Sequence, residues 1–154
     1  MSSWTFEERK EFEKLQKTFE AYLEERMGEI DISGTARASL QIGEKNSLKD
    51  RFLKMLEECN QSKIPNFTST QYQEADRKLN TLYNKTRHKK YFEASGITSE
   101  GIQKTQRAWL KYRDAWVTFG RQKCPNITED SWKTLMTKER IKELQSLTEM
   151  GKEK

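Results

Sequence analysis

The side chains best suited to chemistry in this sequence are a single histidine and two cysteines. His88 lies among the cations of NKTRHKKY, and Cys59 and Cys124 are 65 positions apart. A Ser–His–Asp or Cys–His site needs a base beside an activated nucleophile, and no nucleophile motif accompanies His88. Zinc sites need three or four closely spaced ligands, which this spacing does not supply. We therefore expect no catalytic residue, no metal ligand and no cofactor.

The two cysteines leave two alternatives open. Two reduced thiols are the simpler interpretation. A disulfide between Cys59 and Cys124 would instead close a long loop and stabilise the fold by roughly 3–5 kcal/mol, because it restricts the unfolded chain. The intact mass under non-reducing conditions distinguishes the alternatives.

Cations are densest around His88, at Lys85, Arg87, Lys89 and Lys90. Such a cluster can bind nucleic acid or anionic lipid by displacing counterions from phosphates. It is also typical of the solvated end of a helix, where cations interact favourably with the helix dipole. We expect the helix end, and keep polyanion binding as the alternative function.

The stretch GEIDISGTARASLQIGEKNS, residues 28–47, contains three glycines and few bulky apolar residues. It predicts a long loop with a short helical turn in TARASL. Long irregular loops in compact domains are frequently functional. An inhibitor that fills a glycosidase cleft would use such a segment to present Asp31 or Ser33 to the catalytic carboxylates, so we take Asp31, Ser33 and Thr35 as candidate protein-binding residues. A simple connector packed on the bundle is the alternative.

Four tryptophans lie at helical spacing and are expected to be mostly core residues. Trp4 and Trp116 are the two that we also consider as exposed anchors of a protein-binding face, because exposed tryptophans often dominate the energetics of interfaces.

Composition and periodicity predict an all-α fold that positions these residues. Apolar residues make up 33% and charged residues 34% of the 154, with only two prolines, which suits long helices. We expect one domain spanning 1–154, an antiparallel bundle of about five helices. Thr70 with Gln73 is the expected capping box of the third helix, and Thr128 the N-cap of the fifth. The expected helices cover about 5–27, 48–58, 70–90, 99–119 and 128 onward, the last ending in a frayed, charged tail.

Two segments of the chain are alike. Aligning Gln16 with Gln106 pairs Phe19 with Trp109 and Tyr22 with Tyr112, and KDRFLKML (49–56) then meets KERIKELQ (138–145) at nearly the same offset. We predict an internal repeat in which the first two helices (12–58, a partial copy) correspond to the last two.

Gln106 and Arg113 lie two helical turns apart and flank the buried aromatic stripe of the fourth helix. Buried polar groups need partners, since an unsatisfied donor costs about 1–3 kcal/mol. We predict that Gln106, Arg113 and Asn80 form one hydrogen-bonded network that fixes the register of the last three helices.

The phrases DRKLNTLYNK (76–85), QRAWLKYRDAW (106–116) and TKERIKEL (137–144) together resemble the lysozyme-inhibitor-like LprI N-terminal family over about 70–148. The resemblance implies a small helical domain exported by bacteria, with lysozyme inhibition as one attributed activity. Where the family commonly has a cysteine soon after Tyr-Arg-Asp, this chain has Trp116. The matching positions, most of which we expect to be structural, are Asp76, Leu79, Asn80, Tyr83, Gln106, Trp109, Tyr112, Arg113, Asp114, Arg140 and Leu144.

These observations favour a non-enzymatic bacterial envelope protein that binds another protein, with a lysozyme as the candidate partner; a structural accessory protein is a further alternative. Nucleic acid is not the expected partner. One argument opposes a lysozyme: lysozymes are commonly basic, and the net charge of +5 would repel them. The charge is unevenly distributed, because residues 1–58 have 13 acidic and 10 basic side chains, whereas 59–154 have 11 acidic and 19 basic.

No run in the sequence reaches the ~20 apolar residues of a membrane span. The start, MSSWTFEERKEFEK, has neither the basic nor the apolar region of a signal peptide. We expect a periplasmic or secreted protein if a signal peptide has been removed, and a cytoplasmic one otherwise.

Overall fold

The computed structural model describes residues 3–91 and 93–150. Within these ranges the chain forms five α-helices, two single-turn 3-10 helices and no strand, which confirms the all-α prediction. The tail expected after the last helix, at 151–154, lies outside the described residues. The elements are α1 (Phe6–Arg26), η1 (Met27–Glu29), α2 (Arg37–Asn60), α3 (Ser69–Arg87), η2 (Glu93–Ser95), α4 (Ser99–Lys123) and α5 (Glu129–Met150).

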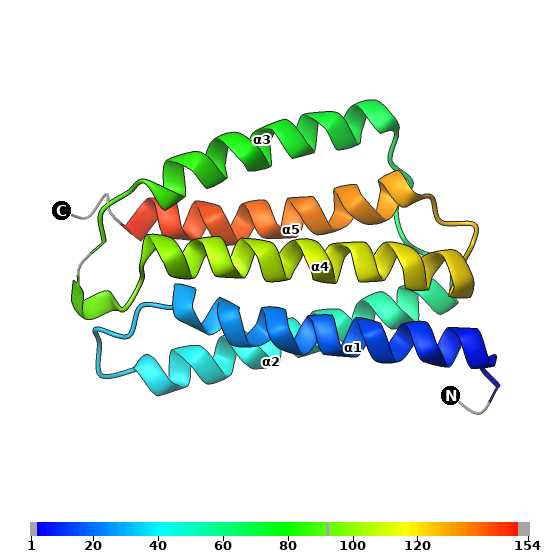
Figure 1. Cartoon of the computed structure of the whole chain (residues 1–154), viewed down its shortest axis with the longest axis horizontal. Helices are drawn as coiled ribbons and strands as arrows, with labels where there is room; N and C mark the ends of the chain where they lie inside the picture. The colour runs from blue at the N-terminus through cyan, green and yellow to red at the C-terminus, as the bar shows by residue number, and fades with distance from the viewer. Residues whose placement is uncertain (1–2, 92, 151–154) are drawn as a thin grey trace.

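Consecutive helices alternate in direction, as expected for an antiparallel bundle (Figure 1). The closest neighbours are α1 with α4 and α3 with α5, and α4 also packs on α5. The Thr105 hydroxyl at the start of α4 donates to the Glu25 carbonyl at the end of α1 over 2.9 Å. Residues 30–36 and 93–98 therefore meet at one end of the bundle, and the connections 61–68 and 124–128 lie at the other (Figure 1).

Threonine side chains cap the starts of α1, α3, α4 and α5, whereas α2 follows Ala36 and has no side-chain cap. The Thr128 hydroxyl accepts from the Ser131 amide over 3.1 Å, as predicted. The capping box of α3 is formed by Thr68 with Gln71, so the pair Thr70 and Gln73 was wrong by two residues. The same sequence pattern occurs at both registers, and the helix uses the one that starts immediately after Phe67.

The largest correction concerns residues 28–47. Helix α2 begins at Arg37, so only residues 30–36 form an irregular connection. The prediction of a long loop over 28–47 was therefore wrong. Gly43, which suggested a break, has no atom within 4 Å of the position a Cβ would take. An exposed glycine costs a helix only about 1 kcal/mol. The Arg26 Nε–Glu44 Oε2 contact of 2.9 Å helps to hold this first half of α2 against the end of α1.

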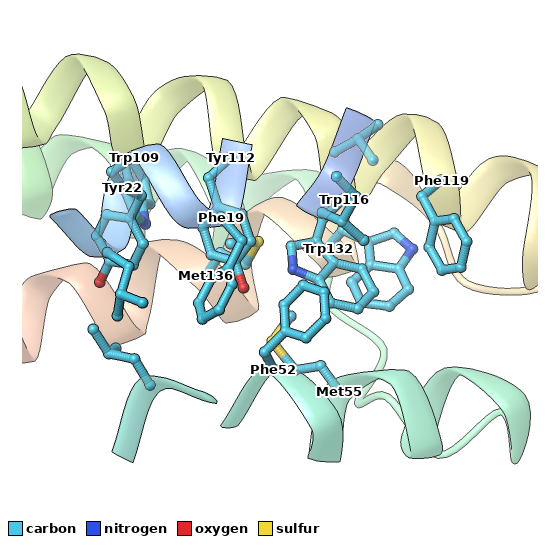
Figure 2. Packing of buried hydrophobic residues seen from close by; sticks show 14 of the residues in the cluster. Phe19, Tyr22, Phe52, Met55, Trp109, Tyr112, Trp116, Phe119, Trp132 and Met136 are labelled. Atoms are coloured by element: carbon cyan, nitrogen blue, oxygen red, sulfur yellow. The ribbon is translucent and has the colours of Figure 1, made fainter. Parts of the chain in front are cut away.

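The core is a continuous aromatic cluster between α1, α2, α4 and α5 (Figure 2). Trp116 stacks on Trp132 with ring centroids 5.0 Å apart, and Tyr22 stacks on Tyr112 at 5.3 Å. Trp109 and Tyr112 are 2% and 5% exposed, which confirms the inward-facing stripe. Trp116 is fully buried, so its role as an exposed anchor was wrong.

Trp4 is not an exposed anchor either. Its ring meets Phe12 edge-on at 5.1 Å and Phe119 at 5.6 Å, and the ammonium of Lys123 lies 4.9 Å from its centroid. These contacts make Trp4 a half-buried lid over the core at the end of the bundle away from 30–36.

Cys59 and Cys124 form a disulfide, so the simpler interpretation of two reduced thiols was wrong. The bridge joins the last turn of α2 to the residue that follows α4, and the two cysteines are 1% and 6% exposed. It therefore attaches α2 to the rest of the core at the end opposite 30–36.

The internal repeat stays a prediction. Under the proposed alignment Gln16 and Gln106 are equivalent, but Gln16 is exposed whereas Gln106 is buried. The paired aromatics, Phe19 with Trp109 and Tyr22 with Tyr112, are all buried.

Candidate protein-binding site

A buried network of charged side chains underlies one end of the bundle. At its centre is Arg140 of α5, which makes a two-pronged contact with Glu29 of η1, both N–O distances being 2.7 Å. Arg140 also donates from Nη1 to Glu143 over 2.8 Å and from Nε to the side-chain oxygen of Gln106 over 2.8 Å. All its donor nitrogens are therefore satisfied inside the protein, as a fully buried guanidinium requires.

Arg26 extends this network toward α2. Its Nη1 lies 3.0 Å from Glu29, and its Nε contacts Glu44 at 2.9 Å and Glu143 at 3.6 Å. The Tyr22 hydroxyl donates to Glu143. Two arginines thus share three carboxylates, and each ion contacts at least one partner of opposite sign.

The electrostatic environment keeps Arg140 and Tyr22 in the protonation states that these contacts require. Burial lowers the pKa of Arg140, but Glu29 and Glu143 outweigh it, so the pKa is raised and the guanidinium stays charged. Burial, together with the charge of Glu143, raises the pKa of Tyr22 well above its usual value. The phenol therefore remains a neutral donor.

The predicted network was right about Gln106 and wrong about its partners. Arg113 donates to the Tyr72 hydroxyl over 3.3 Å, pairs with Asp114 at 3.2 Å and lies over the Trp109 ring. Asn80 is exposed and donates to Asp76 over 3.4 Å.

Sequence reasoning missed the acidic half of the network, because Glu29 lies in the stretch 28–47 that was predicted to be a loop. The available signal was the repeated spacing of an arginine three positions before a glutamate, as in Arg26–Glu29 and Arg140–Glu143. Arg140 itself was expected to be structural, and its burial agrees with that role.

Above this network, residues 30–36 and 93–98 form what we call the two-loop surface. The Ile32 amide donates to the Ser95 carbonyl over 2.9 Å, which ties the two loops together. Gly96 has φ +76°, and a Cβ there would lie 2.9 Å from the Ile32 side chain. The Tyr91 hydroxyl donates to the Thr86 carbonyl over 3.0 Å, and burial together with the charge of Glu29 raises its pKa to about 12. Glu29, which is paired with Arg140, directly precedes the first loop, so the buried network holds the start of that loop.

Asp31, Ser33 and Thr35, the candidate binding residues, all lie on the two-loop surface. The Asp31 carboxylate accepts from the Ser33 amide over 2.8 Å and from the Ser33 hydroxyl over 2.5 Å. These hydrogen bonds lower the pKa of Asp31 and keep it ionised. Ser33 and Thr35 are exposed. Trp4, proposed with them, lies at the opposite end of α1, about 30 Å away for a helix of this length.

The local charge here is opposite to that of the whole chain. Residues 27–36 and 91–103 contain no lysine or arginine, and their acidic side chains are Glu29, Asp31, Glu93 and Glu100, of which Glu29 is buried. The nearest cations in sequence are Arg26, Arg37, Lys90 and Lys104, at the borders of these segments. The two loops themselves thus carry only acidic charges, Asp31 and Glu93, while the cations of 85–90 lie at the same end of the bundle.

The basic cluster of 85–90 is partly occupied by internal contacts. Lys89 donates to the Leu147 carbonyl over 3.2 Å and to that of Thr148, so it caps the end of α5. Arg87 lies over the Tyr83 ring at 5.6 Å. Lys85 and Lys90 are exposed. Of the four cations in the cluster, Lys89 thus already donates to backbone carbonyls of α5, and Arg87 has a ring contact within the protein.

Across residues 3–91 and 93–150, no group of three His, Cys, Asp or Glu side chains is arranged to hold a metal ion. In the same ranges no helix has the length and apolar character needed to cross a membrane.

Comparison with known families gives one match. The family model described as Lysozyme inhibitor LprI matches residues 54–144, which include both cysteines, Gln106, Arg140 and the second loop of the two-loop surface. The match begins earlier than the resemblance seen at 70–148 and leaves Glu29 and the first loop outside it. No curated protein and no solved structure matches the chain.

Proposed function

Because this chain belongs to the LprI lysozyme inhibitor family, we propose that it is a non-enzymatic protein that binds a lysozyme-type muramidase through the two-loop surface. The observation that carries the proposal is the pair of ordered loops whose only charged side chains, Asp31 and Glu93, are acidic on a molecule with a net charge of +5. Opposite charge at the contact selects the orientation in which a basic enzyme meets these loops, even though the net charges of the two proteins repel.

The rigidity of the surface supports an inhibitory role. The Ile32–Ser95 hydrogen bond and the Asp31–Ser33 contacts hold both loops before any partner arrives. A loop that is already ordered loses less conformational entropy on binding, and so binds more tightly. Beneath it, the pairing of Glu29 with Arg140 anchors the segment that leads into the first loop.

Within a glycosidase cleft, the two-loop surface would face a carboxylic acid and a carboxylate. The ionised Asp31 can accept a hydrogen bond from the protonated acid. A hydroxyl such as that of Thr35 can donate to the carboxylate. Together these contacts would occupy the positions that the glycosidic bond needs, so the enzyme would be blocked without any reaction by this chain.

An exported location fits this function. Disulfides persist mainly in oxidising compartments, and Cys59–Cys124 is the type of bridge found in the periplasm or outside the cell. The family is typically exported. We therefore propose that the protein meets its muramidase partner in the bacterial envelope.

The test measures how the purified protein slows lysis of a cell-wall suspension by a basic lysozyme-type muramidase. Replacing Glu93 of the two-loop surface, together with Glu100 in the first turn of the helix that follows it, by Gln is expected to weaken inhibition about tenfold at low salt, and less at 0.5 M salt, where charges are screened. The matched control is Glu13→Gln with Glu20→Gln, which removes two exposed carboxylates from α1.

An equal loss of inhibition in both double variants would point to net charge rather than to the two-loop surface. Absence of inhibition by the wild-type chain, with direct binding also absent by calorimetry, would remove the proposal.

A further inference from the structure

A charged groove runs between α1 and α4, along the side of the bundle. Its volume is about 460 Å³. Small side chains form its floor, and four cations and two carboxylates form its sides. The lining residues are Lys17, Thr18, Ala21, Glu24, Glu25, Lys104, Arg107, Ala108 and Lys111.

The cations of this groove are available to a ligand. Lys17, Lys104, Arg107 and Lys111 are exposed, and none makes an ion pair, hydrogen bond or ring contact with the described part of the chain. Their helical positions, and the antiparallel packing of α1 on α4, place Lys17 near Lys111 and Arg107 further along the same groove.

The groove between α3 and α5 is different, although it also contains lysines. There Lys138 lies over the Phe67 ring at 4.7 Å, and Lys142 pairs with Glu139 at 3.7 Å. Two of its three lysines thus already have partners within the protein. Of these two grooves, the α1–α4 groove is the one in which unpaired positive charge gathers.

We propose that the α1–α4 groove binds an acidic polysaccharide, a sugar chain that bears carboxylates. Its carboxylates would pair with Lys17, Arg107 and Lys111, since a guanidinium matches a carboxylate in geometry as well as charge. Its hydroxyls would donate to Glu24 and Glu25. A ligand with both hydroxyls and carboxylates is the class that uses both signs of charge in the groove.

Other polyanions fit the groove less well. Single-stranded nucleic acid binds by stacking its bases on aromatic side chains, and the lining contains none. A continuous row of phosphates would meet Glu24 and Glu25 with repulsion. A lipid surface is flat and needs exposed apolar side chains, whereas the groove is concave and its floor consists of alanine and threonine.

The experiment titrates a hyaluronan hexasaccharide into the full chain and follows binding by calorimetry at low salt. A neutral chitin hexasaccharide and a single-stranded DNA 12-mer are the comparison ligands. Binding of hyaluronan is expected, with at least tenfold weaker binding of chitin and DNA. The triple variant Lys17→Gln, Arg107→Gln, Lys111→Gln is expected to lose hyaluronan affinity at least tenfold.

The matched control is the triple variant Lys54→Gln, Lys63→Gln, Lys85→Gln, which removes three exposed cations elsewhere and leaves the groove unchanged. Equal losses in both triple variants, tighter binding of DNA, or no hyaluronan binding by the wild-type chain would each overturn the proposal. Circular dichroism confirms that both variants are folded. Muramidase inhibition is scored separately, because the groove does not include the two-loop surface.

Discussion

Arg140 and Glu29, 111 positions apart in the chain, form a buried two-pronged ion pair with both N–O distances at 2.7 Å. Both side chains are fully buried. The pair joins the middle of α5 to the single turn that ends α1, and so fixes the point from which the chain leaves for residues 30–36. One interaction thus connects the core of the bundle to the proposed binding surface.

Removing one member of this pair is expected to destabilise the folded protein strongly. Arg140→Met leaves Glu29 and Glu143 buried with fewer partners, which should lower the free energy of unfolding by about 3–5 kcal/mol. Arg51→Met is the control, because Arg51 pairs with Glu139 at the surface and such pairs contribute about 1 kcal/mol or less. Urea unfolding measures both. A loss at Arg140 no larger than that at Arg51 would contradict the role assigned to the network.

Much of the fold could be predicted from the sequence, whereas most of the buried ionic network around Arg140 could not. Periodicity predicted the five helices and the buried stripe with Trp109 and Tyr112, because each depends on spacing within one helix. Of the carboxylates that pair with Arg140, Glu29 lies on another element, and nothing in the local sequence marks it as a partner. The start of α2 was misread because Gly43 looks like a break in sequence, whereas in the structure it merely faces solvent.

Gly120 and Gly43 are both inside helices, yet alanine should have opposite effects at the two positions. A Cβ at Gly120 would lie 2.6 Å from Cε2 of Trp132, so Gly120→Ala forces α4 and α5 apart and should cost about 1–3 kcal/mol. Gly43→Ala meets no atom within 4 Å and should stabilise by about 0.5–1 kcal/mol. Thermal melting compares them. The same sign of change at both glycines would refute the close approach of the two helices.

The buried tyrosines predict a loss of stability at alkaline pH. Burial raises the pKa of Tyr112 above its usual value near 10, so above pH 10 the unfolded state releases a proton that the folded state keeps. Stability should then fall by up to about 1.4 kcal/mol per pH unit for each such residue. Tyr112→Phe should reduce this slope between pH 10 and pH 12, as measured by urea unfolding at a series of pH values. An unchanged slope would mean that Tyr112 ionises equally easily in both states.

The Cys59–Cys124 bridge predicts sensitivity to reduction. It spans 65 positions, and in the chain-entropy description its loss should cost about 4 kcal/mol. Replacing both cysteines by Ser, or adding a reductant, should lower the melting temperature, with no further effect of reductant on the double variant. Non-reducing mass spectrometry should show the oxidised chain two daltons lighter than the reduced one. If the melting temperature of the wild-type chain does not change when reductant is added, the bridge does not stabilise the fold.

A substitution at Gly96 should change the shape of the two-loop surface more than the stability of the bundle. Its φ of +76° disfavours any residue with a Cβ, and that Cβ would also press on Ile32. Gly96→Ala should therefore displace the two loops from each other and cost about 1–2 kcal/mol. Because the core lies beyond the loops, inhibition of the muramidase should fall more steeply than the melting temperature. Gly34→Ala is the control within the same surface, since a Cβ there comes no closer than 3.9 Å to another atom. If both variants inhibit like the wild type, the ordered arrangement of the loops is not what the partner recognises.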